Sequence, residues 1–514
     1  MPDRYDVVIV GGAFSGASAA ILLRRELPEL RVLVVEKAEA FDEKVGEATT
    51  EMSAMFLTRR LAMWQHLERE QLPKEGLRYW FTNGNVTGHA NASETGGLLR
   101  STVPAFQLRR DKLDEHLLAT AVAEGAELLR PARVNNITVG DFDHRLTVEA
   151  HGETREISCR WLLDASGRVN LVGRKLNLIE RNDEHPTAAI WCRWKNVRHI
   201  DELAVQLGIA KSNVGSRRLG TNHYTGYGYW IWVIPLGNGE TSIGVVFDKR
   251  LVDLHHSKNR GEDFVAFLKA IPSLNELLEG AEPRLADLRF YSHLAYAAKQ
   301  YMGRGWSLLG DAAAFLDPYY SPGLDHASFT VEATVEMIKA DVMGKDLTPM
   351  IAEHNETFVR SYWRFFRAAY KDKYYYMGEA DLLSAAMLID TAQYYIFVVV
   401  PAYRLMKKFH WMPVLGPKPA FLSYHLMRMY NRRFKAIAEA RRAAGVAGLH
   451  NEGRRISAYF NLGFAPLRMV LRGLKLWGRA ELGLLRRMAR RKRVTAQPAP
   501  PASPSPVHPP AAPR

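Results

Sequence analysis

The chain has 514 residues, of which 47% are hydrophobic and 24% are charged, and its formal net charge at pH 7 is +14. This length allows two or three packed domains, and the composition is that of a soluble globular protein. Only two cysteines occur, Cys159 and Cys192. They exclude a disulfide-rich secreted scaffold and indicate a reducing, cytoplasmic location.

The first stretch of the chain predicts a βαβ unit. Tyr5–Val10 is an apolar run rich in Val and Ile, typical of a strand buried on both faces. A helix is expected over Ala17–Glu26 and a second buried strand over Arg31–Glu36. A glycine-rich turn joins the first strand to the helix. This order of elements is that of a dinucleotide-binding domain.

The turn carries Gly11, Gly12, Ala13 and Gly16, so Ala13 stands where the G-x-G-x-x-G pattern has its second glycine. A pyrophosphate would rest on the helix N-terminus, where free N–H groups and the helix dipole favour an anion. Glu36 follows Gly16 by twenty positions, the spacing of a carboxylate that binds ribose hydroxyls. A glycine loop alone also fits an ordinary βα turn; the complete set favours FAD or NAD over NADP.

Two further acidic turns follow predicted strands. Asp164 ends the strand before Ala165-Ser166-Gly167, and Gly310-Asp311 ends another. Asp164 is either a second cofactor-side acid or a plain strand end. Asp311 is placed to reach the sugar or ribityl hydroxyls of a cofactor. It can also be the N-cap of a helix that begins at Ala312, and both interpretations can be true.

Helical patterns occupy Met52–Glu70, Arg110 to about Glu124, and most of the chain after residue 330. Leu383–Tyr403 is apolar enough to just span a bilayer, but a buried helix or a shallowly inserted face is preferred. Pro466–Val494 is a basic amphipathic helix suited to an anionic membrane or an acidic partner. No nucleic-acid motif accompanies its basic residues, and a solvated basic tail is the preferred interpretation of this charge. Gln497–Arg514 is expected to be disordered.

Four motifs together resemble the FAD-dependent monooxygenase fold of the para-hydroxybenzoate hydroxylase type. They are the glycine loop with Glu36, the pair Arg110 and Asp114, the turn after Asp164, and Gly310-Asp311. The resemblance covers roughly residues 5–335. It implies an α/β fold in which a Rossmann-like FAD domain (1–335) is interleaved with a mixed substrate sheet (roughly 75–105 and 175–300). A helical C-terminal region (336–495) and a disordered tail (496–514) would follow. The implied cofactor-binding residues are Gly11, Gly12, Ala13, Gly16, Glu36, Glu47, Arg110, Asp164, Gly310 and Asp311.

Within that fold the chain resembles the flavin-dependent halogenases. Trp230-Ile231-Trp232-Val233-Ile234-Pro235 matches their W-x-W-x-I-P motif, and Val45–Thr49, with Glu47, resembles their second flavin-side segment. Lys74 falls near the place of the family's catalytic lysine, which would hold hypohalous acid as an electrophile. The alternative for the tryptophan motif is an aromatic strand that only packs in the core, and the alternative for Lys74 is an ordinary surface lysine.

The resemblance is imperfect where the halogenases bind halide. Ser321 and Gly323 are the implied halide-binding residues, but Pro322 between them has no N–H to donate. A shift of one position would let Gly323 and Leu324 serve instead.

The resemblance implies an FAD-dependent halogenase that receives reduced flavin from a separate reductase. Its substrate would be an electron-rich phenol or pyrrole of secondary metabolism, free or tethered to an acyl carrier protein. No metal is implied. Two alternatives stay open: a flavin hydroxylase or dehydrogenase of the same fold that binds no halide, and a membrane-associated flavoprotein partner of a biosynthetic complex without turnover.

Overall fold

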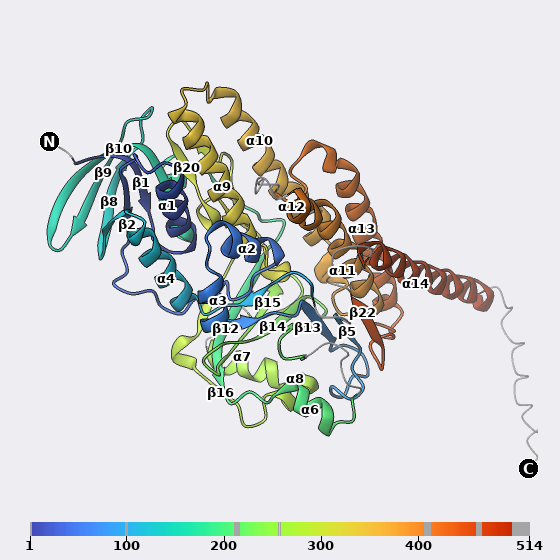
Figure 1. Cartoon of the computed structure of the whole chain (residues 1–514). Helices are drawn as coiled ribbons and strands as arrows, with labels where there is room; N and C mark the ends of the chain where they lie inside the picture. The colour runs from blue at the N-terminus through green and yellow to red at the C-terminus, as the bar shows by residue number, and fades with distance from the viewer. Residues whose placement is uncertain are drawn as a thin grey trace, which may run out of the picture.

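The computed structural model describes residues 3–97, 101–209, 216–254, 256, 259–405, 413–458 and 465–495. One of its two large sheets lies at the left of Figure 1 and the other near the middle, and the C-terminal helices gather on the right. The predicted tail, Gln497–Arg514, lies outside the described residues.

The first large sheet has eight strands in the order β19-β20-β10-β1-β2-β7, with β9 paired to β10 and β8 paired to β9. β1 pairs in parallel with β2 and β10, so Val10 lies opposite both Val35 and Asp164. The carboxyl ends of these strands therefore share one edge, where ligands bind in open α/β sheets. The strands are β1 (Asp3–Val10), β2 (Val32–Val35), β7 (Glu127–Leu129), β8 (Ala132–Thr138), β9 (His144–Ala150), β10 (Glu153–Asp164), β19 (Met302–Gly303) and β20 (Trp306–Leu308).

The predicted βαβ unit is confirmed. Helix α1 (Phe14–Glu26) follows β1 and begins one turn earlier than predicted. It packs between α4 (Arg110–Ala123), which starts at the predicted residue, and α9 (Gly323–Val342). The apolar residues of β1, α1 and β2 are almost fully buried, so these three elements form part of the hydrophobic core.

The second large sheet has nine strands in the order β16-β12-β15-β14-β13-β4-β5-β22, with β17 paired to β12. β22 comes from the region predicted to be helical, and it pairs in parallel with β5. The C-terminal region is therefore not purely helical, because one of its segments completes this sheet. The strands are β4 (Leu77–Phe81), β5 (Glu94–Gly97), β12 (Thr187–Lys195), β13 (Thr221–Gly226), β14 (Tyr229–Pro235), β15 (Thr241–Asp248), β16 (Glu282–Pro283), β17 (Arg289–Tyr291) and β22 (Arg455–Ala458).

Two predictions about helices are wrong. The pattern over Met52–Glu70 is interrupted, because Ala62 adopts a left-handed backbone (φ 60°) that ends a helix. It divides into α2 (Glu51–Met55), the π-helical turn η1 (Phe56–Arg60) and α3 (Trp64–Glu70). No helix starts at Ala312 either: a 3₁₀ turn, η4 (Gly310–Ala312), leads into the short strand β21 (Ala314–Phe315), which pairs with β18 (Tyr296–Ala298).

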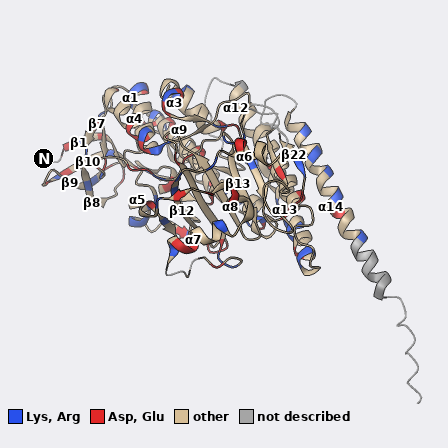
Figure 2. Cartoon of the chain, turned by 90° about the horizontal axis from the view of Figure 1, so that it is seen from below, with Lys and Arg blue, Asp and Glu red and all other residues tan. Residues whose placement is uncertain are grey.

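The remaining helices are mostly C-terminal. Ala380–Tyr403 is long and apolar enough to cross a membrane, but 78% of its most apolar window is buried within the molecule. The predicted basic helix is present as α14, where Lys and Arg recur along its length (Figure 2). These helices are α5 (Leu171–Lys175), α6 (Ile200–Gln206), α7 (Arg260–Lys269), α8 (Pro272–Leu277), α10 (Thr348–Phe365), α11 (Ala380–Tyr394), the π turn η8 (Tyr395–Val399), α12 (Val400–Leu405), α13 (Phe421–Ala443) and α14 (Ala465–Thr495).

Candidate active site

One cavity of about 1170 Å³ connects the two large sheets. Its wall includes Gly11 and Ala13 of the glycine-rich turn and Glu36 from the first sheet, and Trp230 and Trp232 from the second. The segment from Ser321 to Leu324, at the start of α9, lines the same space. A cofactor held on the turn and a substrate held beside the tryptophans would therefore share one cavity.

The glycine-rich turn forms a tight backbone cradle. A Cβ added to Gly16 would lie 1.8 Å from the carbonyl oxygen of Gly11, and one added to Gly11 would lie 2.4 Å from that of Ala165. Gly11 also has φ +104°, which favours glycine. Ala13 is the N-cap of α1 and its side chain accepts no N–H, so the first-turn amides remain for a ligand. This arrangement fits the diphosphate of FAD.

Glu36 lies at the end of β2 and is only 5% exposed. Its carboxylate accepts hydrogen bonds from the N–H of Gly12 (2.7 Å) and the N–H of Ala38 (2.8 Å). These bonds hold an acid against the turn and leave lone pairs for hydroxyl donors. The position suits the ribose of an adenosine.

Basic side chains balance the acids along the cavity. Arg110 is held by both carboxylate oxygens of Asp114, at 3.0 and 3.1 Å, and lines the cavity. Burial raises the pKa of Asp311, and the nearby guanidinium groups of Arg168 and Arg110 and the ammonium of Lys44 act in the opposite direction. Asp311 lines the cavity from η4. Its further predicted role as the N-cap of a helix is wrong, because no helix begins at Ala312 and Leu309 is the N-cap of η4.

Gly12, Gly16, Asp164 and Gly310 were all predicted to contact a cofactor, but none of them is in the cavity wall. The Asp164 carboxylate accepts hydrogen bonds from the Ser166 hydroxyl (2.6 Å) and from the N–H of Val172 (2.8 Å). These bonds order the loop that follows Asp164. The residues of that loop, Ala165–Arg168, line the cavity, whereas Asp164 itself does not. Gly310 has φ +54° and donates its N–H to the Thr330 hydroxyl at 2.9 Å.

Glu47 lines the cavity as part of a buried ionic cluster. Its carboxylate lies 2.7 Å from the guanidinium of Arg193, which also lies 2.8 Å from Asp287. Burial raises the pKa of Glu47, and the charge of Arg193 opposes that shift. The cluster ties the Val45–Thr49 segment to β12 of the second sheet.

The tryptophan motif lies on β14, at the centre of the nine-stranded sheet. Trp230, Trp232 and Ile234 line the cavity, whereas Pro235 does not. The Trp230 indole N–H donates to the Tyr374 hydroxyl (3.0 Å), which donates to Asp317 (2.6 Å). Both interpretations of the motif therefore hold, since the tryptophans are packed in a strand and also form the wall of the cavity.

Lys74 is not a surface lysine. It is 5% exposed, and its ammonium donates to the Thr49 carbonyl oxygen at 2.7 Å. Burial lowers its pKa to about 8, against the opposing charges of Glu51 and Asp325. Lys74 is outside the cavity wall, but its charge helps to lower the pKa of His223, which is in the wall.

The segment before α9 has fewer free donors than predicted. Ser321 has a left-handed backbone (φ 54°), and its N–H donates to the Pro318 carbonyl oxygen at 2.9 Å. Pro322 is the N-cap of α9 and has no N–H. For residues 321–324, all of them described, the amides of Gly323 and Leu324 are those without an acceptor. This corresponds to the alternative in which the halide site is shifted by one position, to Gly323 and Leu324.

Sequence reasoning missed a buried cation next to this segment. Lys373 is fully buried, with its ammonium 2.9 Å from the Asp390 carboxylate and 3.0 Å from the Tyr320 hydroxyl. The Tyr320 hydroxyl also donates to Asp390 at 2.6 Å. The network fixes Tyr320 directly before Ser321. No local pattern marks it, because its members are far apart in the chain.

Comparisons with known proteins agree with this geometry. The family model described as "FAD binding domain" matches residues 4–324. The flavin-dependent halogenase chlA of Dictyostelium discoideum is 29% identical over 451 residues, which cover 80% of this chain and 73% of that protein. A 1H-pyrrole-2-carbonyl-[peptidyl-carrier protein] brominase of Pseudoalteromonas luteoviolacea is 25% identical over 68% of this chain and 80% of its own.

Among solved structures, the halogenase PltM in complex with phloroglucinol and FAD superposes with a TM-score of 0.75. The two sequences are 17% identical, and the match covers 93% of this chain and 96% of the other. At that identity the likeness concerns the fold, and it extends through the C-terminal helices.

Proposed function

Because the chain belongs to the FAD-binding-domain family and, within it, to the flavin-dependent halogenases, we propose that it halogenates an electron-rich aromatic compound. The observation that carries the proposal is the single cavity shared by the glycine cradle, Trp230, Trp232 and the start of α9. Reduced FAD, when bound, would supply the electrons that activate O₂. The chain would hold that group through the amides of α1, Glu36 and Arg110.

Two groups of this chain would handle the halogen. The Gly323 and Leu324 amides at the N-terminus of α9 suit a halide ion, since free N–H groups and the helix dipole favour an anion. The Lys74 ammonium would hold hypohalous acid by a hydrogen bond and keep it electrophilic. In this arrangement Asp325 and Glu51 maintain part of the lysine in its charged form.

For the substrate we propose a phenol or a pyrrole. One similar structure contains phloroglucinol, and one relative is named for a pyrrole carried on a peptidyl carrier protein. A carrier-tethered substrate is therefore part of the proposal, as is a separate reductase that supplies reduced FAD.

The test is an assay of purified protein with FAD, a flavin reductase, NADH, O₂ and either chloride or bromide. Phloroglucinol and a carrier-bound pyrrole are the substrates, and mass spectrometry measures the product. We expect a halogenated product that requires the reductase. A product that carries oxygen and no halogen would contradict the proposal.

A flavin monooxygenase that binds no halide is the second candidate. Pro322 and the internally bonded N–H of Ser321 favour it, because they remove two backbone donors from the start of α9. The same assay distinguishes it by an oxygenated product whose rate does not depend on halide.

Replacing Pro322 with serine is expected to lower the KM for halide. The change restores one N–H, and a hydrogen bond to a charged group contributes about 1.5–3 kcal/mol, so the KM should fall about tenfold or more. The halide dependence of the halogenation rate is the measurement. Pro349→Ser, at the exposed start of α10, is the matched control and should leave KM unchanged. An unchanged KM in Pro322→Ser would mean that other groups bind the ion.

The halogenation rate is expected to fall as the pH rises through 8. Folding lowers the pKa of Lys74 from 10.5 to about 8, so the ammonium is lost above that pH. Between pH 7 and 9 the charged fraction drops about tenfold, and the rate at saturating substrate should follow it. The unfolded chain binds more protons in this window, so Lys74 makes the folded state more stable as pH rises. A rate that increases through pH 8 would show that the neutral amine acts.

A further inference from the structure

Helix α14 carries an exposed ridge of leucines. Their numbers rise by three or four, with Gly478 filling the single gap, so they share one face of the helix. The side chains are 44–61% exposed, and the ridge extends about 27 Å at 1.5 Å per residue. Its members are Leu467, Leu471, Leu474, Leu482 and Leu485.

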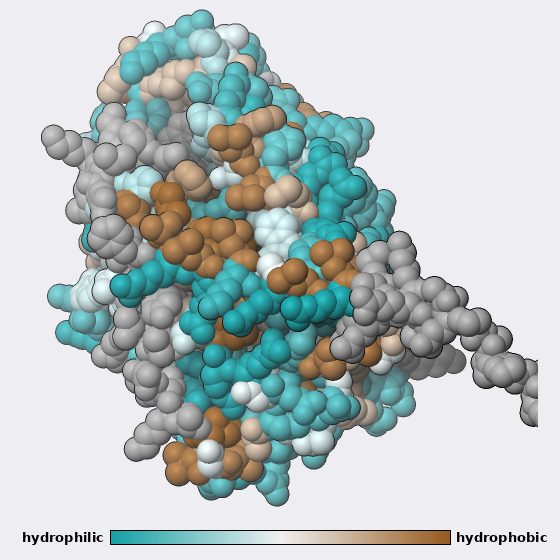
Figure 3. All heavy atoms as spheres, turned by 90° about the vertical axis from the view of Figure 1, so that its right-hand side faces the viewer, coloured by the Kyte–Doolittle hydropathy of each residue, from teal (hydrophilic) through white to brown (hydrophobic). Residues whose placement is uncertain are grey.

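Helix α13 extends this apolar surface. Leu422, Leu426 and Met429 follow the same spacing and are 78%, 41% and 52% exposed. Arg433, next on that face, forms an ion pair with Glu481 of α14 at 2.7 Å. This pair joins the exposed edges of the two helices. The side of the molecule that carries them shows hydrophobic patches between hydrophilic ones (Figure 3).

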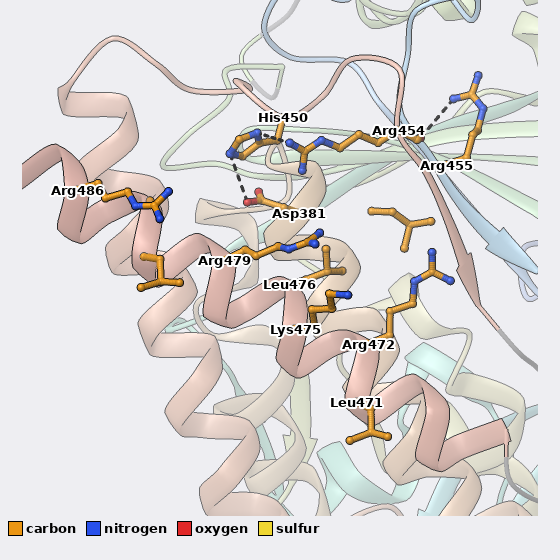
Figure 4. A pocket seen from close by; sticks show the side chains of 13 residues that line it. Asp381, His450, Arg454, Arg455, Leu471, Arg472, Lys475, Leu476, Arg479 and Arg486 are labelled. Atoms are coloured by element: carbon orange, nitrogen blue, oxygen red, sulfur yellow. Dashed lines mark hydrogen bonds and ion pairs between the residues drawn. The ribbon is translucent and has the colours of Figure 1, made fainter.

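A cationic groove of about 980 Å³ lies beside the leucine ridge, and Leu471 and Leu482 of the ridge are part of its wall. Arg472, Lys475 and Arg479 extend from α14 toward the segment that holds Arg454 and Arg455 (Figure 4). Its six Lys and Arg side chains are Arg454, Arg455, Arg472, Lys475, Arg479 and Arg486.

The positive charge of this groove is poorly compensated. Asp381 is the acid in its wall, and its two carboxylate oxygens each lie 2.7 Å from Arg441. Within the part of the chain that the structure describes, Lys475, Arg479 and Arg486 form no ion pair. Arg455 is paired with Glu94 at 3.4 Å, and the convergence of the other like charges favours the binding of an anion.

We propose that α13 and α14 form a membrane-binding face for anionic phospholipid. The leucines would enter the boundary between headgroups and acyl chains, and the groove would bind lipid phosphates. A basic face flanking an apolar face is the pattern of helices that lie on anionic membranes. The ridge consists of leucines without Trp or Tyr, whereas protein interfaces concentrate aromatic anchors in pockets. This inference does not depend on the proposed halogenation.

The test is cosedimentation of the FAD-loaded full chain with vesicles. Vesicles of phosphatidylcholine alone are compared with vesicles that also contain phosphatidylglycerol. We expect at least about tenfold tighter binding to the anionic vesicles, and salt should weaken it. Leu471→Ser with Leu482→Ser should abolish binding to both kinds of vesicle. Lys475→Gln with Arg479→Gln should remove only the preference for phosphatidylglycerol.

Matched controls come from exposed residues elsewhere in the molecule. Val205→Ser on α6 and Lys345→Gln after α9 should bind vesicles as the wild type does. FAD content and thermal unfolding should stay unchanged in every variant, because the altered side chains are exposed. Absence of vesicle binding at low salt, or binding that neither α14 variant changes, would overturn the proposal. The proposal would also be overturned if the wild-type protein did not bind vesicles but bound an acidic carrier protein through the same residues.

Discussion

Lys74→Met is expected to reduce the halogenation rate about 100- to 1000-fold, the range seen when one donor to a reacting oxygen is removed. Methionine keeps most of the buried volume but removes the ammonium that would hold hypohalous acid. Lys74 lies outside the wall of the cofactor cavity, so the affinity for FAD and the oxidation of reduced flavin by O₂ should not change. The measurements are product formation per bound FAD and stopped-flow flavin oxidation.

A matched lysine variant and the pH profile distinguish a catalytic role of Lys74 from a purely structural one. The variant leaves the Thr49 carbonyl oxygen without its donor, which costs about 1–3 kcal/mol, but it also removes an ammonium that burial disfavours, so the net change in stability should be small. Lys299→Met removes a half-exposed lysine paired with Glu180 and should change neither rate nor stability appreciably. The inflection near pH 8 should disappear in Lys74→Met. Product formation at the wild-type rate would remove Lys74 from the reaction.

Gly16→Val is expected to weaken FAD binding at least about 100-fold, equivalent to ~2.7 kcal/mol. A Cβ at this position would lie 1.8 Å from the Gly11 carbonyl oxygen, so the turn must open and its amides must move away from the diphosphate. Flavin fluorescence titration measures the Kd. The turn already accommodates the Cβ of Ala13, whereas a Cβ at Gly16 would clash with the backbone of the same turn.

Gly483→Val provides the control for Gly16→Val, because a Cβ at Gly483 meets no atom within 4 Å. It should bind FAD as the wild type does. Circular dichroism and thermal unfolding establish whether Gly16→Val is folded. A folded Gly16→Val protein with wild-type affinity would mean that the diphosphate rests elsewhere.

The sequence predicted features whose determinants are contiguous. The βαβ unit, Glu36 and the tryptophan strand each depend on neighbours within about thirty residues, so their patterns of burial and spacing are visible in the chain. Asp311 shows the limit of such patterns. Its placement in the cavity wall was predicted, but its further predicted role as a helix cap is wrong because β18 pairs with β21 where a helix was expected.

Other features depend on distant partners and carry no local signal. Asp164 looks like a cofactor-side acid, yet the hydroxyl and amides of its own loop occupy its carboxylate. Ala62 is a good helix former, and only tertiary packing makes it end a helix. Lys373 and Asp390 meet Tyr320 from 53 and 70 residues away, a distance over which periodicity predicts nothing.

The pairing of β22 with β5 has a consequence for biosynthesis. Residues 455–458 complete a sheet whose neighbouring strand, residues 94–97, leaves the ribosome hundreds of residues earlier. Until the partner arrives, β5 is an open edge strand that can pair with another chain. At about 5–20 residues per second this exposure lasts tens of seconds. Expression at lower temperature or with a chaperone should therefore raise the soluble yield, and chains truncated before β22 should aggregate.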